Sequence, residues 1–270
     1  MESFYVDRPL NFAHRGASHK APENTLAAFL LAVELGADGI ELDVQLSRDG
    51  EAVVIHDLNL ETTTDGHGLV RNSTLAELKK LNAGSWYDPA FSDQRIPTLQ
   101  EVIDAAGHHL LLNIELKTSS LRDDGLAATV VRIIEENHLQ DRVVVSSFNP
   151  LAVRRVKRLN PSIPVGLLYA PDMPFFLRRP WSRHLLQPEA LHPHLSIIDE
   201  KYMRWAREHG YRVHTWTVDE PDEMGQLMRL GVDLIITNRS DLLNQMLVSK
   251  PGGQAPSDSE KPSVPYPTGS

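Results

Sequence analysis

Charged side chains interrupt four short apolar segments. The core of a soluble protein is normally built from apolar residues, so charges within such segments are unusual. Glu41 and Asp43 are two residues apart in "GIELDVQL", so in a β-strand both side chains point to the same face. The same spacing separates Glu115 from Lys117 in "LLLNIELK", and Asn113 lies on that face too. The other two segments, "FAHRG" and "VVIHD", carry histidines near their ends. The candidate residues are His14, Arg15, Glu41, Asp43, His56, Glu115 and Lys117.

These residue types suit the metal-assisted cleavage of a phosphodiester. Three carboxylates in one place repel one another, and burying each without a partner costs several kcal/mol. A divalent cation would neutralise them, and oxygen-only ligands favour Mg²⁺ or Ca²⁺ over Zn²⁺. Two histidines left free of the metal could act as general acid and general base near neutral pH. Arg15 and Lys117 could hold the non-bridging oxygens of the phosphate.

Each residue taken alone has a simpler explanation. A single acid in a strand most often belongs to a salt bridge, Lys117 could pair with Glu115, and His14 could be a hydrogen-bonded residue at a strand end. In a parallel barrel, however, the carboxyl ends of all strands open onto one face, where active sites lie. The coincidence over four segments therefore favours one shared site.

Aromatic residues at other segment ends are candidates for the walls of a binding pocket. Trp216 in "HTWTV" could stack on a small organic group, and packing in the core is an equally good explanation. Phe148 and the pair Trp86–Tyr87 are similar candidates. His192 and His194 could lie at the mouth of a barrel, but little else supports a role for them.

Short apolar segments alternate with helical patterns along most of the chain, which predicts a parallel α/β fold. The expected strands are 10–14, 38–44, 52–56, 109–116, 142–148, 164–169, 190–195, 212–218 and 233–237. The expected helices are 25–35, 98–106, 124–138, 149–159, 199–209, 220–230 and 240–247. Asn24 or Thr25 would cap the first helix.

The number of segments favours a (β/α)₈ barrel of the TIM type over an open doubly wound sheet. Nine strands are one too many for the barrel, but only "SRDGE", with its Asp49–Gly50 turn signal, joins the second segment to the third. These two segments are expected to form a hairpin-like excursion after strand 2, which leaves eight strands linked by helices. Neither dinucleotide-binding nor Walker-type glycine motifs are present, which weakens the open-sheet alternative.

Two regions depart from the alternation. Residues 58–97 are expected to be a long insertion with one short helix near 74–81, and a loop of this length is usually functional. Residues 249–270, rich in Pro, Ser and Gly, are expected to be a disordered tail. Residues 1–248 would then form a single domain.

Composition limits the partners and the location. The 270 residues include 27 Lys and Arg against 36 Asp and Glu, and the resulting charge of −9 disfavours nucleic acid and stable membrane anchoring. Cysteine is absent, which excludes disulfides, thiolate metal sites and a cysteine nucleophile. Neither a signal peptide nor a membrane-spanning segment is visible, so a cytoplasmic location is expected.

The sequence resembles the glycerophosphodiester phosphodiesterase family, relatives of the phosphatidylinositol-specific phospholipases C. The matching segments are "AHRGASHKAPENTLAAF", "GIELDVQLSRDGEAVVIHD", "NIELK", "SSF", "HTWTV" and "GVDLIITN", which follow the family's order. The one departure is Asn238, where the family more usually has Asp, and we expect it to have no effect on the chemistry.

The resemblance implies a barrel that binds one divalent cation, Mg²⁺ or Ca²⁺. It implies metal ligands at Glu41, Asp43 and Glu115 and catalytic histidines at His14 and His56. Phosphate contacts are implied for Arg15 and Lys117, and 58–97 is similar to the excursion that follows the family's second histidine.

The implied reaction is hydrolysis of small glycerophosphodiesters to sn-glycerol 3-phosphate and an alcohol. The alternative is lysophospholipase D-like hydrolysis of lysophospholipids at the same site, for which Phe175, Phe176 and Trp181 in "PDMPFFLRRPW" could form an apolar entry. A barrel that binds phosphodiesters without cleaving them is disfavoured, because both histidines and all three acids are present.

Overall fold

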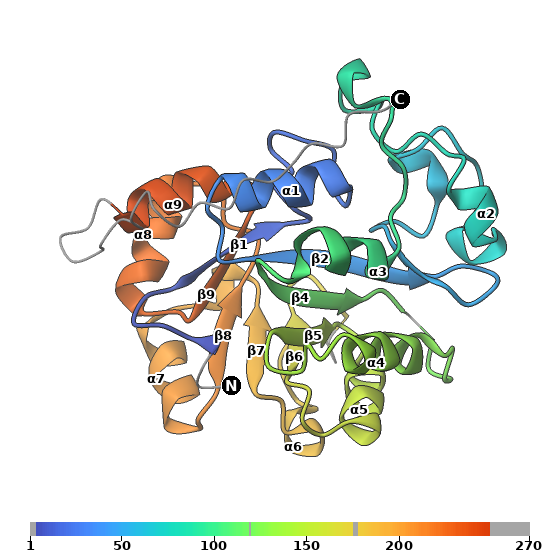
Figure 1. The fold of residues 1–270 in the computed structure, drawn as a ribbon. Coiled ribbons are helices and arrows are strands. Elements are labelled where there is room, and N and C mark those ends of the chain that lie inside the picture. The colour runs from blue at the N-terminus through green and yellow to red at the C-terminus, as the bar shows by residue number, and fades with distance from the viewer. Residues whose placement is uncertain (1–3, 119, 175–177, 249–270) are drawn as a thin grey trace.

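A computed structural model describes residues 4–118, 120–174 and 178–248. Its sheet runs in the order β1-β9-β8-β7-β6-β5-β4-β2-β3, and β1 also pairs with β2 (Figure 1). The parallel strands are β1 (Leu10–His14), β2 (Gly39–Leu46), β4 (Leu111–Leu116), β5 (Val143–Ser147), β6 (Val165–Tyr169), β7 (Ala190–Pro193), β8 (Arg212–Thr215) and β9 (Leu234–Thr237).

The sheet closes on itself, because β1 is hydrogen-bonded on both edges. Phe12 is paired in parallel with Gly39 of β2 and with Ile236 of β9. Within the described residues this gives the predicted (β/α)₈ barrel of eight parallel strands. The ninth strand, β3 (Ala52–Val54), runs antiparallel to β2 and outside the barrel, which confirms the predicted hairpin.

Helices follow most strands and cover the outside of the barrel. Thr25, not Asn24, caps the first of them, because its hydroxyl accepts from the Ala28 amide. The longer helices are α1 (Leu26–Glu34), α4 (Leu126–Glu136), α5 (Pro150–Leu159), α7 (Glu200–Glu208), α8 (Pro221–Leu230) and α9 (Ser240–Val248).

Two helical segments differ from the expectation. The helix expected at 98–106 is one α-helical turn, α3 (Leu99–Val102), followed by a π-helical turn at Ile103–Gly107. A further one-turn helix, α6 (Arg183–Leu186), was not expected, since a single turn shows no helical period in the sequence. The segment 249–270, expected to be a disordered tail, lies outside the described residues.

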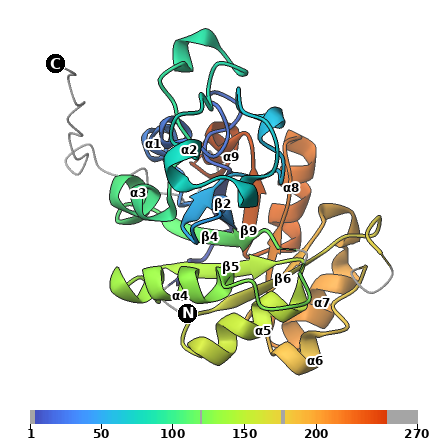
Figure 2. The same ribbon diagram turned by 90° about the vertical axis from the view of Figure 1, so that its right-hand side faces the viewer.

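The insertion 58–97 is a set of turns around a small apolar core of its own. Its longest helix, α2 (Leu75–Leu78), is shorter than the expected 74–81 and starts with a capping box between Thr74 and Glu77. Figures 1 and 2 place the segment on the side of the barrel toward which the β2 and β4 arrows point. Its core residues are Val53, Ile55, Leu60, Val70, Leu78, Ala83 and Ile96.

The barrel interior changes from apolar to polar along its axis. At the amino ends of the strands, Phe4, Leu10 and Phe12 pack with Val144 and Leu234. Toward the carboxyl ends of the strands, β2 and β4 carry the acidic side chains of Glu41, Asp43 and Glu115. The apolar layer thus fills one end of the barrel, and the polar residues lie at the end where active sites of such barrels are found.

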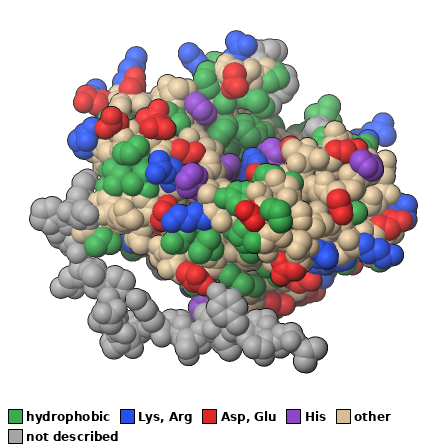
Figure 3. All heavy atoms as spheres, turned by 90° about the horizontal axis from the view of Figure 1, so that it is seen from above, with side chains coloured by type: hydrophobic (Ala, Val, Ile, Leu, Met, Phe, Trp, Pro, Cys, Tyr) green, Lys and Arg blue, Asp and Glu red, His purple; other side chains and the backbone are tan. Residues whose placement is uncertain are grey.

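The outer surface mixes charges of both signs, and Figure 3 shows acidic and basic side chains interspersed over one face. None of the helices in the described part of the chain is both long and apolar enough to span a membrane.

Gly166 on β6 makes room for a buried histidine. A Cβ at this position would lie 2.3 Å from Nε2 of His192, whose side chain is fully buried. Gly166→Ala should therefore lower the free energy of unfolding by about 1–3 kcal/mol, the usual cost of overpacking a core. Urea denaturation followed by circular dichroism measures the change.

The control for this prediction is Gly225→Ala on helix α8. There the nearest atom to the added Cβ is the flexible Arg229 guanidinium at 3.4 Å. Alanine favours helix by up to about 1 kcal/mol over glycine, so this variant should be as stable as the wild type or more so. Equal stability of Gly166→Ala and the wild type would contradict the packing argument.

Candidate active site

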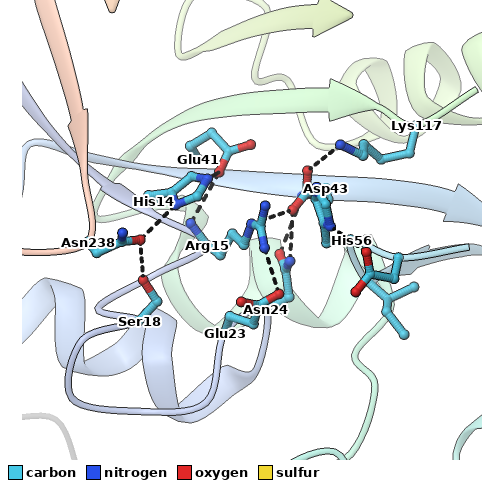
Figure 4. Close-up of polar contacts among 12 residues, drawn as sticks. His14, Arg15, Ser18, Glu23, Asn24, Glu41, Asp43, His56, Lys117 and Asn238 are labelled. Atoms are coloured by element: carbon cyan, nitrogen blue, oxygen red, sulfur yellow. Dashed lines mark hydrogen bonds and ion pairs between the residues drawn. The ribbon is translucent and has the colours of Figure 1, made fainter. Parts of the chain in front are cut away.

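The predicted residues come together at the carboxyl ends of the strands, around one cavity of about 100 Å³. His14 and Arg15 come from the end of β1, and Glu41 and Asp43 from β2 (Figure 4). The cavity is lined by His14, Arg15, Glu41, His56, Asn113, Glu115, Lys117, Phe148, Leu168, Trp216, Thr217 and Ile236.

Three buried carboxylates dominate the electrostatics of this site. Oxygens of Glu41, Asp43 and Glu115 lie within 4.8 Å of one another, and the residues are only 3%, 1% and 9% exposed. Burial raises the pKa of Glu41 well above its ordinary value, and the charges of Asp43 and Glu115 raise it further. Burial likewise raises the pKa of Glu115, with Lys117 opposing it.

Asp43 is the carboxylate with the strongest support for its charge. Burial alone would raise its pKa, but Lys117 and Arg15 outweigh this effect and the pKa is lowered. Nδ2 of Asn24 also donates to Oδ2 of Asp43 at 2.9 Å, and Oδ1 of Asn24 accepts from the Asp43 amide. Asp43 is therefore the acid of the cluster that ionises most readily.

The cluster fits a hard divalent cation. Two basic side chains, Arg15 and Lys117, face three acids, so all three carboxylates can be charged together only if a further cation joins them. The buried Oδ1 of Asn113, which lines the same cavity, has no hydrogen-bond partner within the described part of the chain. A donor set made only of oxygens is the one that Mg²⁺ and Ca²⁺ prefer.

Arg15 is held in place by a strained backbone and by the acids around it. Its φ of +56° is uncommon for a residue with a side chain. Nη1 donates to Glu23 at 2.8 Å, Nε lies 3.3 Å from Asp43, and the backbone amide donates to Glu41. These contacts keep the guanidinium at the cavity instead of in solvent.

Lys117 closes the opposite side of the acidic cluster. Its ammonium group donates to Glu115 at 2.9 Å and lies 3.5 Å from Asp43. Burial lowers the pKa of Lys117, but the two carboxylates outweigh it and the pKa is raised, so the side chain stays charged. Both predicted phosphate-contacting residues thus bring a fixed positive charge to the site.

His14 is oriented by a chain of hydrogen bonds that starts at Asp219. Oδ2 of Asp219 accepts from Nδ2 of Asn238 at 2.6 Å, and Oδ1 of Asn238 accepts from the Ser18 hydroxyl at 2.8 Å. This fixes which end of the amide faces His14, whose Nδ1 lies 2.7 Å from the Asn238 oxygen (Figure 4). Because an amide oxygen only accepts, Nδ1 must carry the hydrogen.

The other ring nitrogen of His14 is therefore unprotonated in the neutral ring. Nε2 faces the acidic cluster, 3.9 Å from Oε2 of Glu41. Burial and the nearby Arg15 lower the pKa of His14 to about 4. At neutral pH the side chain can accept a proton at Nε2.

His56 stands at the more open end of the site. Its Nδ1 lies 2.9 Å from Oδ1 of Asp57. The side-chain amide of Gln45 donates to the backbone carbonyls of Ile55, His56 and Asp57, which fixes the segment that carries the ring. The two histidines therefore approach the acidic cluster from different elements.

Trp216 and Phe148 form an aromatic wall of the cavity. Their rings meet edge to face at 5.4 Å, and the Trp216 indole donates to the His192 carbonyl. His192 itself is buried inside the barrel, against His214. Trp86 and Tyr87, the other expected wall residues, do not line this cavity; the Tyr87 hydroxyl donates to the His19 carbonyl.

The sequence did not indicate the residues that hold the predicted site residues in place, Asn24, Asn238 and Asp219. Asn24 was considered only as a helix cap, but the adjacent Thr25 takes that role and leaves Asn24 for Asp43. The sequence did offer one signal for Asn24: two adjacent polar residues competed for a single helix cap, so one of them was free for another role. Asn238 was expected to have no effect on the chemistry, and its side-chain oxygen lies 2.7 Å from Nδ1 of His14. Nothing in the sequence marked Asp219.

The closed barrel with an acidic, histidine-containing site at its strand ends places the chain among phosphodiesterases of the TIM-barrel type. Residues 14–242 match the glycerophosphoryl diester phosphodiesterase family, and the chain belongs to this family.

Individual relatives agree. A glycerophosphodiester phosphodiesterase of Caldanaerobacter subterraneus subsp. tengcongensis is 42% identical over 87% of this chain and 96% of its own. One from Bacillus subtilis is 33% identical over 89% and 87% of the two chains. Among solved structures, an Oleispira antarctica phosphodiesterase in complex with the product sn-glycerol-3-phosphate has a TM-score of 0.82 at 34% identity, covering 90% of this chain and 98% of that one.

The acidic cluster generates a prediction about metal binding that does not depend on activity. Mg²⁺ or Ca²⁺ should raise the thermal midpoint, because an ion at 100 times its dissociation constant stabilises the folded state by about 2.7 kcal/mol. Glu41→Gln, which removes one of the three carboxylates, should abolish most of this shift in differential scanning fluorimetry.

Glu136→Gln is the matched control. Within the described residues, this exposed residue on α4 pairs only with Arg132, one turn away, so its variant should keep the full shift. An equal shift in wild type and Glu41→Gln would rule out the cluster as the cation site.

Proposed function

We propose that this protein hydrolyses glycerophosphodiesters to sn-glycerol 3-phosphate and an alcohol, with the help of one divalent cation. The main support is one cavity lined by two histidines, two basic side chains and the acids Glu41 and Glu115, with Asp43 within 4.8 Å of both acids, in a chain of this family. The Oleispira antarctica structure, which holds sn-glycerol-3-phosphate, agrees with this product.

Glu41, Asp43 and Glu115 would hold the cation, Mg²⁺ or Ca²⁺. When bound, the cation supplies positive charge that stabilises the phosphoryl group and lowers the pKa of a nearby hydroxyl. Arg15 and Lys117 would contact the non-bridging phosphate oxygens, the first through its planar fork and the second as a point charge. Trp216 and Phe148 offer an apolar wall to the carbons of the glycerol.

His14 is our candidate for the general base. Its Nε2 takes the proton of the glycerol 2-hydroxyl, whose oxygen then attacks phosphorus while the bond to the alcohol breaks. His56 donates a proton to the departing alcohol oxygen. This first step leaves a cyclic phosphate. In the second step of the reaction, His56 takes a proton from water and the water oxygen attacks phosphorus. The ring bond to the 2-oxygen breaks, and His14 returns its proton to that oxygen.

The lysophospholipase D-like alternative is not favoured by the relatives, which are named for glycerophosphodiesters. Phe175 and Phe176, two of the three residues that suggested it, lie outside the described residues. The third, Trp181, is 60% exposed and lines a different cavity with Tyr202 and Trp205.

The two-histidine mechanism predicts that His14→Ala and His56→Ala each lower kcat by about 10²–10⁴-fold, the usual contribution of a general acid or base. Release of sn-glycerol 3-phosphate from glycerophosphocholine and glycerophosphoethanolamine is the assay, with Mg²⁺, Ca²⁺ or EDTA. The surface variant His67→Ala, whose side chain is 87% exposed, should retain wild-type kcat. Turnover that survives thorough chelation, or near-normal turnover in His56→Ala, would refute the mechanism.

The contact between Asn238 and His14 predicts a second kinetic effect. Asn238→Ala should lower kcat about 10- to 100-fold with little change in KM, because loss of an orienting partner leaves the ring free to turn while the phosphate contacts remain. The control is Asn244→Ala, an asparagine on α9 that binds the Leu35 carbonyl. Unchanged kcat in Asn238→Ala would remove Asn238 from the catalytic arrangement.

A further inference from the structure

A second cavity, of about 590 Å³, adjoins the active site and shares Lys117 with it. Three segments enclose it: the end of β2 with the turn that follows, the start of the insertion, and the loop between β4 and α4. Gln45 and Leu46 contribute from the first segment, Leu58 and Arg71 from the second. We call this cavity the insertion groove.

The insertion groove lies at the His56 end of the site. In Figure 4, Lys117 and His56 stand on the Asp43 side of the acidic cluster, and His14 stands on the Glu41 side with Asn238. Gln45, which lines the groove, binds the carbonyl of His56 itself. An alcohol that takes its proton from His56 therefore departs toward the groove, and this step rests on the proposed function.

The charges of the insertion groove favour an anionic group. Arg48, Arg71 and Lys117 line it against one acid, Asp124, whose carboxylate already accepts from the Thr118 hydroxyl. Lys117 forms ion pairs with Glu115 and Asp43, and Arg48 forms one with Glu77 at 3.4 Å. Among the residues that the structure describes, Arg71 has no ion-pair partner and is exposed to solvent.

The groove also lacks what a quaternary ammonium group would need. Recognition of choline relies on aromatic faces around the cation, and no aromatic residue lines this cavity among the described residues. The lining thus carries more basic than acidic side chains, although the whole chain has a net charge of −9. We propose that the insertion groove is the subsite for the leaving alcohol, and that Arg71 makes it prefer a headgroup bearing a carboxylate.

The test compares glycerophosphoserine with glycerophosphoethanolamine, whose headgroups differ only by one carboxylate. Wild-type kcat/KM should be higher for glycerophosphoserine, and Arg71→Ala should lower the ratio of the two values about threefold to tenfold. This range is that of a charge-assisted hydrogen bond at an exposed site. Arg71→Lys should restore part of the ratio.

Arg95→Ala is the matched control. Arg95 also belongs to the insertion, but its guanidinium donates to the Ser92 and Gln94 carbonyls and does not line the groove, so the ratio should not change. Hydrolysis of both substrates with the same ratio in wild type and Arg71→Ala would overturn the subsite while leaving the proposed function intact. Hydrolysis of neither substrate by the wild type would overturn the proposed function itself.

Discussion

The packing of three carboxylates into one buried position is the constraint on which the site depends. Asp43 and Glu115 are directly paired across β2 and β4, and Glu41 lies two residues earlier on the same face. A closed sheet does not let these strands move apart to relieve the repulsion. The protein places Arg15 and Lys117 against the acids, which is one positive charge fewer than three ionised carboxylates would carry. The position therefore favours a bound cation or a protonated acid, and the raised pKa of Glu41 reflects the same repulsion.

The same cluster divides the site into two unequal ends. At one end, His14 is half-buried and is fixed by Asn238 and Asp219, so its free nitrogen points in one direction. At the other end, His56 follows a short hairpin strand and faces the insertion. In the proposed mechanism His14 is the base and His56 the acid, and this difference between the two ends suits a reaction in which the nucleophile belongs to the bound substrate and the leaving group must escape.

How far the sequence predicted this arrangement follows from the kind of signal each residue gives. Charged residues in apolar segments are conspicuous in the sequence. The carboxyl ends of parallel strands lie on one face of a barrel, and this rule alone predicts that Glu41 and Glu115 lie close together. Asn238 and Asp219 gave no such signal, because neutral or loop residues gain meaning only from partners fixed by tertiary structure. The break of 98–106 into two helical types was hidden because one turn of each is too short to show its own period in the sequence.

The departure from barrel regularity at β3 ties the fold to the proposed specificity. A regular unit would place a helix after β2, and that helix would cover the outer wall of the barrel without reaching its mouth. Here the chain turns back as β3, which pairs with β2, and His56 follows two residues after the end of β3, before the insertion begins. The turn that replaces the helix supplies Arg48, and the insertion supplies Arg71, so one change of topology delivers both the second histidine and the groove beside it. Headgroup preference can therefore vary through the insertion while the acidic cluster, held by β2 and β4, stays the same.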